Sequence, residues 1–184
     1  MVIIPSWDVE RMQEEMARGS AFHYLAILGF LKDNAPALIS EFNKVFAINK
    51  TYFLHMGKLN PLELAMAIAQ VEQNLFGSKM EVDGDENSAS VTYRYINEWA
   101  RVAEFGILTE EDHMNMHAHF VLAIDELGRE MELSTRVAYA EEGLVVTFSK
   151  GSIESQAGES TASESAAETA INETAADGNE SSAL

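Results

Sequence analysis

The chain has 184 residues, of which 47% are apolar and 23% charged, and its formal net charge is −18 at pH 7. This length suits one ordinary domain with a real hydrophobic core. Twelve basic residues against thirty acidic ones argue against binding to nucleic acid or to an anionic membrane surface. Because the sequence contains no cysteine, it excludes disulfides, thiol nucleophiles, thiolate zinc sites and iron–sulfur clusters.

The C-terminal segment differs in composition from the rest of the chain. Residues 151–184 include seven acidic residues and no basic one, and most of the others are Ser, Ala, Thr, Gly or Asn. Their only large apolar side chains are Ile153, Ile171 and Leu184. Such a segment cannot bury enough apolar area to offset the entropy of ordering it. The sequence therefore predicts one folded domain over residues 1–150 and a disordered acidic tail over residues 151–184.

The N-terminal sequence lacks the features of a secretory signal. Residues 1–5 contain no basic residue, and Pro5 and Asp8 follow the first apolar side chains at once. The most apolar window, residues 21–31, is far shorter than the ~20 residues that span a bilayer. We therefore interpret that window as a buried helix and expect a cytoplasmic protein.

Apolar residues recur at helical spacing through the first half of the chain. Ser6 is expected to cap the first helix, Pro36 and Pro61 interrupt the pattern, and Gly77 is typical of a helix C-terminus. The pattern predicts four helices, over residues 7–19, 20–32 and 36–56 and from Pro61 to Gly77.

Apolar and polar residues alternate after Lys79, which is typical of half-buried strands. Turns are expected at Gly84 and Gly143. The pattern predicts hairpins over residues 79–95 and 133–148, with helices over 96–105 and 109–131 between them. Segregated helices and hairpins predict an α+β fold in which N-terminal helices precede two β-hairpins that form an antiparallel sheet, with a helix pair between the hairpins.

Three of the five histidines lie within seven residues of the helix predicted over 109–131. At about 100° per residue, His113 and His117 lie about 40° apart, on the stripe that also carries Phe120, whereas His119 points to the polar side. We therefore expect His113 and His117 to face inward, where a pocket opening onto that face would explain them.

The His113–His117 pair has three interpretations. It is a hydrogen-bonded core feature, or it performs ligand-binding and acid–base chemistry with His117 as general base and His113 orienting it. Alternatively, both histidines bind a divalent metal such as zinc or iron, with further ligands from elsewhere. The glutamate of the zincin motif is absent, because Met114 follows His113.

Polar and aromatic residues cluster where the first hairpin gives way to a helix. Arg94 can clamp a substrate carboxylate or pair with Glu98 on the surface. Tyr93, Tyr95 and Tyr139 can line a pocket or pack in the sheet. The predicted substrate-binding set consists of Arg94, Tyr93, Tyr95, Glu98 and Trp99.

Residues 91–99 (Val-Thr-Tyr-Arg-Tyr-Ile-Asn-Glu-Trp) and 138–148 (Ala-Tyr-Ala-Glu-Glu-Gly-Leu-Val-Val-Thr-Phe) carry a resemblance. In element order and hairpin pattern, the segment 79–149 resembles the L-2-amino-thiazoline-4-carboxylic acid hydrolase-like family and the related vinyl-reductase-type ligand-binding domains. Cysteines of those families correspond to the following positions here: Ile96, His117 and Val145. Their thiol chemistry therefore does not carry over, and the resemblance implies only the fold and a small-molecule pocket between sheet and helices.

The leading hypothesis is a protein that binds a small organic ligand beside the helix over 109–131. If it is an enzyme, hydrolysis or proton transfer through the histidine pair is the expected reaction. One alternative is a non-catalytic accessory or sensor subunit whose methionine-rich helices bind a larger enzyme partner or a second copy. The other alternative is a metal-binding protein.

Overall fold

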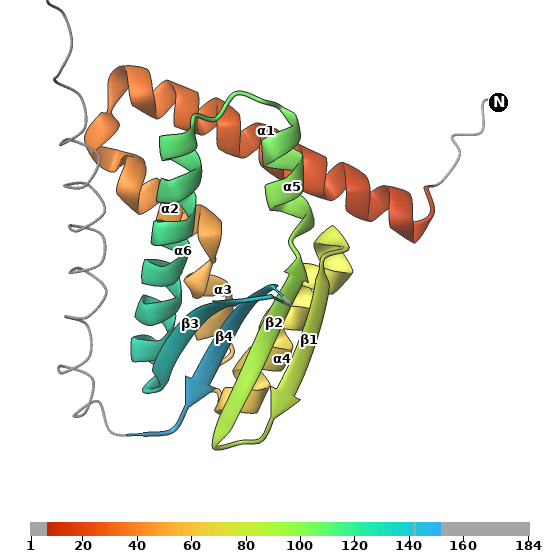
Figure 1. Ribbon diagram of the computed structural model, residues 1–184, viewed down its shortest axis with the longest axis vertical. Helices are drawn as coiled ribbons and strands as arrows, with labels where there is room; N and C mark the ends of the chain where they lie inside the picture. The colour runs from red at the N-terminus through yellow and green to blue at the C-terminus, as the bar shows by residue number, and fades with distance from the viewer. Residues whose placement is uncertain (1–6, 142, 152–184) are drawn as a thin grey trace, which may run out of the picture. The chain divides into compact units, whose positions relative to one another are not determined.

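The computed structural model describes residues 7–141 and 143–151 and confirms the predicted α+β fold (Figure 1). The first half of the chain is helical: α1 (Val9–Asn34), η1 (Pro36–Leu38), α2 (Ile39–Ala47), α3 (Lys50–Leu54), α4 (Pro61–Val71) and the π-helical turn η2 (Glu72–Phe76). Two hairpins with a helix pair between them follow: β1 (Lys79–Gly84), β2 (Ser88–Tyr95), α5 (Asn97–Glu104), α6 (Glu110–Met131), β3 (Ser134–Ala140) and β4 (Gly143–Ser149). Ser6 and the predicted tail from residue 152 onward lie outside the described residues.

The two hairpins form one four-stranded antiparallel sheet in the order β1-β2-β4-β3. Val91 of β2 pairs with Val146 of β4, which pairs in turn with Val137 of β3. Side chains alternate between the two faces of each strand, so Val91 and Val146 share one face. The opposite face carries polar pairs such as Ser90 and Thr147, whose hydroxyl oxygens lie 2.8 Å apart.

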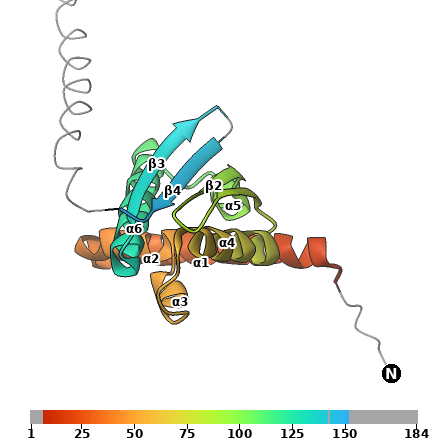
Figure 2. The ribbon, with the colours of Figure 1, turned by 90° about the horizontal axis from the view of Figure 1, so that it is seen from below.

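Helices α4 and α6 cover the apolar face of the sheet, and Figure 2 shows α4 next to β2. Fully buried side chains from all three layers meet there, among them Leu64, Val91, Ile124, Leu127 and Val146. Helix α4 begins with a capping box between Asn60 and Glu63, and α6 begins with the predicted box between Thr109 and Asp112. These caps define where the two helices start, and their apolar side chains determine which faces pack against the sheet.

A second apolar cluster joins α1 to α5, α2 and α6 above the sheet (Figure 1). Tyr24 of α1 stacks on Phe42 and lies against Phe46 of α2, with ring centroids 5.4 and 4.2 Å apart, respectively. The Tyr24 hydroxyl donates to the Asn43 side chain at 3.1 Å. Trp99 of α5 packs against both clusters and so links the helical layer to the sheet.

Three of the four helices predicted in the N-terminal half have the wrong bounds, whereas the helix predicted from Pro61 to Gly77 is confirmed by α4 and η2. The helices predicted over 7–19 and 20–32 are one helix, α1, capped by Asp8, because buried residues continue at helical spacing through Ala17, Ala21 and Tyr24. The helix predicted over 36–56 is divided, because Ile48 adopts an extended conformation after α2.

The interpretation of residues 21–31 as a buried helix is also wrong. Only one side of α1 is buried in this window, whereas the Phe22 and Phe30 side chains are 59% and 63% exposed. The apolar side chains on the other side of the helix have no covering element within residues 7–141 and 143–151.

Candidate ligand-binding pocket

A cavity of about 420 Å³ lies among α1, α2, α3, α4, η2, β2, α5 and α6. Its wall is mostly apolar and includes eight aromatic rings: Phe42, Phe46, Tyr52, Phe53, Phe76, Tyr93, Trp99 and Phe120. Val45, Tyr52 and Leu75 line the cavity and are also largely exposed, so the cavity opens to solvent beside them. This volume lies within the range of small-molecule sites, which are typically mostly apolar with a few polar groups.

Two carboxyl groups, Glu72 and Glu98, line this mostly apolar cavity, together with polar Ser20 and Asn49. Glu72 begins the π-helical turn η2 and accepts a hydrogen bond from the Ser78 hydroxyl at 3.0 Å. Short π-helical turns within α-helices are frequent at functional sites. Glu98 lies in the first turn of α5, and its carboxyl is hydrogen-bonded to Ser20 of α1. Both glutamates are half-buried.

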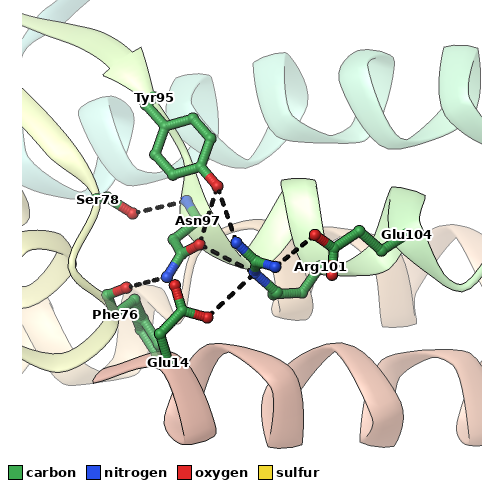
Figure 3. A network of polar contacts seen from close by, with 7 residues as sticks. All are labelled: Glu14, Phe76, Ser78, Tyr95, Asn97, Arg101 and Glu104. Atoms are coloured by element: carbon green, nitrogen blue, oxygen red, sulfur yellow. Dashed lines mark hydrogen bonds and ion pairs between the residues drawn. The ribbon is translucent and has the colours of Figure 1, made fainter. Parts of the chain in front are cut away.

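Asn97 connects the elements that carry the two glutamates (Figure 3). Its backbone amide donates to the Ser78 hydroxyl at 3.1 Å, and its side-chain amide donates to the Phe76 carbonyl at 2.7 Å. The end of η2 is thereby held against the start of α5. Because Ser78 also binds Glu72, one chain of hydrogen bonds leads from the Glu72 carboxyl to the residue next to Glu98.

Arg101 extends this network on the side of α5 that faces α1. Its guanidinium donates to the side-chain oxygen of Asn97 at 3.2 Å and to the Tyr95 hydroxyl at 3.3 Å. It also pairs with Glu14 of α1 at 3.4 Å and with Glu104. The network in Figure 3 therefore ties α1, η2 and α5 together beside the cavity, to which Phe76 belongs.

The environment of the cavity changes the acidity of its carboxyl groups. Burial raises the pKa of Glu98 to about 7, with the Ser20 hydrogen bond lowering it and the Glu72 charge raising it further. Burial also raises the pKa of Glu72, against the hydrogen bond from Ser78. The pKa of the buried Tyr93 rises because of burial and the Glu72 charge. Near neutral pH, Glu98 can therefore either accept or donate a proton inside an apolar wall.

The structure brings three of the five predicted substrate-binding residues to this cavity: Tyr93, Glu98 and Trp99 line it. Arg94 and Tyr95 are not among the lining residues. Arg94 lies outside and pairs with Glu81 on β1, with Nη2 2.8 Å from Oε2. The Tyr95 hydroxyl instead donates to the Asn97 side chain at 3.0 Å, within the network of Figure 3.

The expectation that His117 points inward is wrong, because its side chain is exposed, and His113 is half-buried. Neither lines the cavity. The His117 ring contacts Trp99 edge-on, with centroids 4.9 Å apart, and its Nδ1 lies 3.3 Å from the Tyr139 hydroxyl. Burial, assisted by the charge of His113, lowers the pKa of His117. Within residues 7–141 and 143–151, no three histidines or carboxylates form a cluster that could hold a metal ion.

Sequence reasoning missed Glu72 and Ser20 as residues of the site. Glu72 follows Leu64 and Ile68 at intervals of four, so helical spacing places its carboxyl on the buried side of the α4–η2 segment. An acidic residue at an apolar position of a helix was the available signal. Nothing in the local sequence links Ser20 to Glu98, because only the packing of α1 against α5 brings them together.

Comparison with known protein families and with curated proteins finds no matching family model and no matching relative. The resemblance of residues 79–149 to thiazoline hydrolase-like and vinyl-reductase-type domains therefore stays a prediction. No helix in the part of the chain that the structure describes is long and apolar enough to cross a membrane.

Proposed function

We propose that this protein binds a small, largely aromatic or aliphatic molecule that carries a protonated amine, in the cavity between η2 and α5. The observation that supports this most directly is the pair of half-buried carboxyls, Glu72 and Glu98, in an aromatic wall. No Lys, Arg or His is among the residues found to line the cavity. A ligand cation would supply the positive charge that these two carboxyls lack there.

The cost of burying charge explains why an ammonium group fits best. An ionised carboxylate in an apolar wall is disfavoured unless it is paired, and the raised pKa of Glu98 reflects that burial. An ammonium group stabilises the ionised carboxylate, while the faces of Trp99 and the other rings attract the cation and pack against its apolar part. An anionic ligand would add a third negative charge beside Glu72 and Glu98.

The test uses a matched pair of probes, 4-phenylbutylamine and 4-phenylbutan-1-ol, which differ in charge at one end. Binding is measured by tryptophan fluorescence in a Trp7→Phe background, where Trp99 is the remaining tryptophan. We expect the amine to bind at least tenfold more tightly than the alcohol at pH 8. Glu98→Gln should remove most of this preference without weakening alcohol binding, whereas the exposed-site control Glu86→Gln should keep it.

The pH dependence provides a second readout. The amine pairs with ionised Glu98, so below pH 7 its binding must displace a proton from that carboxyl. With a pKa of about 7, only about one tenth of the carboxyls are ionised at pH 6. Amine affinity should therefore fall roughly tenfold from its plateau by pH 6, while alcohol affinity stays level. Equal affinities for amine and alcohol in the wild-type protein at pH 8 would refute the proposal.

A second candidate function rests on the same pKa. A carboxyl that titrates near pH 7 suits general acid–base catalysis, so proton transfer on a bound substrate is compatible with Glu98. In that case Glu98 would transfer the proton in place of His117. Turnover that is lost in Glu98→Gln and kept in His117→Ala would support this assignment, and the reverse pattern would support the histidine pair.

A further inference from the structure

Helix α1 carries an apolar stripe on the side that faces away from the rest of the described chain, residues 7–141 and 143–151. The spacing alternates between three and four residues, as in the a and d positions of a coiled coil. Four of its side chains are 45–63% exposed although they are large and apolar. We call this set the outer stripe: Val9, Met12, Met16, Gly19, His23, Ala26 and Phe30.

The outer stripe lies nearly opposite the buried face of α1. At about 100° per residue, its members centre roughly 150° away from Ala17, Ala21 and Leu28, which pack against the rest of the chain. Helices of globular proteins usually place polar residues on that side. Exposed Phe22 and Ile27 flank the outer stripe and widen it.

Gly19 lies in the interior of α1, where glycine is less favourable than alanine because it loses more backbone freedom on folding. Apart from its chain neighbours and the backbone of α1 itself, a Cβ built on Gly19 would meet no described atom within 4 Å, and the residue adopts no positive φ. Neither backbone conformation nor packing within the described chain requires a glycine there. Glycine in a helix does permit close approach of a second backbone.

We propose that two copies of this chain associate through antiparallel packing of their outer stripes. With the two-fold axis beside residue 21, Met12 faces Phe30 of the second copy. In the same register, Met16 faces Ala26 and Gly19 faces His23. The two small residues thus each face a large one, which is the alternation that lets helical layers interdigitate.

The size of the surface fits a modest dimer. The six exposed apolar side chains on and beside the outer stripe each present roughly 100 Å², about half of a large side chain. Together they give roughly 600 Å² per chain, or about 1,200 Å² in total, the lower limit of standard protein interfaces.

A parallel arrangement fits the same residues less well. It would place Gly19 against Gly19 and Ala26 against Ala26 of the second copy, which leaves gaps between the helices. It would also place Met12 against Met12 and Phe30 against Phe30. It would also align the two helix dipoles in the same direction. Large-to-small complementarity along the stripe therefore selects the antiparallel register.

The first test measures self-association of the full chain by sedimentation equilibrium. We expect a reversible dimer, weakened at least tenfold by Gly19→Leu, because the new side chain fills the space that His23 of the second copy needs. Gly29→Leu is the matched control: a Cβ there also meets no described atom within 4 Å, and it lies about a quarter turn from the outer stripe. Circular dichroism should show undiminished helix content in both variants, since leucine is the better helix former.

The second test determines the relative orientation of the two α1 helices. Because the sequence contains no cysteine, any disulfide must form between the introduced residues. A mixture of Met12→Cys and Phe30→Cys chains should form a disulfide between the two variants. Each variant oxidised separately should form little disulfide. In the antiparallel register, two copies of residue 12 lie about 27 Å apart along the helix axis. Three results would each overturn the proposal. The chain is a monomer at every attainable concentration, or Gly19→Leu and Gly29→Leu weaken association equally. The third is that each cysteine variant forms disulfides with itself but not with the other variant.

Discussion

Replacing Glu98 with glutamine should change how the stability of the fold depends on pH. The Glu98 pKa is about 7 in the folded chain against an ordinary value of 4.5. Between these two values the folded state holds a proton that the unfolded state releases, so the free energy of unfolding falls as pH rises through that window. Glutamine is neutral throughout and keeps the ability to hydrogen-bond Ser20. Glu98→Gln should therefore stabilise the fold at pH 8 and leave it almost unchanged at pH 4.5.

The size of the effect follows from the two pKa values. Each pH unit between them corresponds to 1.36 kcal/mol, so the full window from 4.5 to about 7 gives about 3 kcal/mol. Glu98 is half-buried rather than enclosed, and water screens part of this cost. We therefore expect about 2 kcal/mol of added stability at pH 8.

Urea denaturation of the wild-type protein and of Glu98→Gln at pH 4.5, 6 and 8 measures this difference. Glu86→Gln, in the exposed turn between β1 and β2, is the matched control and should follow the wild-type curve. The Glu98→Gln variant should keep a smaller fall in stability between pH 4.5 and 8, because burial also raises the pKa of Glu72. An equal loss of stability between pH 4.5 and 8 in wild type and Glu98→Gln would refute the reasoning.

Three further substitutions test other parts of the structure. Gly143→Ala should destabilise the fold by about 2 kcal/mol or more in thermal or urea unfolding, because φ is +133° and the new Cβ would lie 2.3 Å from the Tyr93 carbonyl oxygen. Asp112→Asn should cost about 1–2 kcal/mol at pH 7, because this carboxylate caps α6 and pairs with Lys32 of α1. Burial raises the pKa of Asp112, but hydrogen bonds from Lys32 and the α6 cap outweigh it and lower the pKa, so the cost should shrink as pH falls below about 4. His117→Ala should leave amine binding by the cavity within about twofold in the fluorescence assay, because His117 does not line it; a larger loss would place the ring at the site.

Local patterns in the sequence were sufficient for much of the fold. The Thr109–Asp112 capping box and the turn glycines at positions 84 and 143 all occur where predicted. Alternation of apolar residues also identified the four strands. These features depend on residues within about four positions of one another, so the chain itself specifies them.

Helix interruptions were harder to predict. Gly19 and Ser20 suggest a break, yet α1 continues because its buried face packs against α5 and α2 on both sides of that point. Intrinsic propensity differs by only about 1 kcal/mol per residue, and packing of a long apolar face outweighs it.

The candidate site depends on tertiary structure more than the strands, turns and caps do. Tyr93, Glu98 and Trp99 were predicted as a group because they are close in sequence, but Glu72 and Ser20 reach the same cavity only through the packing of η2 and α1 against α5.

His117 shows the limit of sequence periodicity in the same way. Helical spacing indicates the direction of a side chain to within a stripe, whereas its burial depends on which neighbouring element covers that stripe. Here β3 contributes Tyr139 beside the ring and leaves the ring exposed. The two hairpins, the cap of α6 and the turn glycines followed from the sequence by itself, because they depend on near neighbours. The cavity and its paired carboxyls were decided by contacts between distant segments, whose relative positions no local pattern contains.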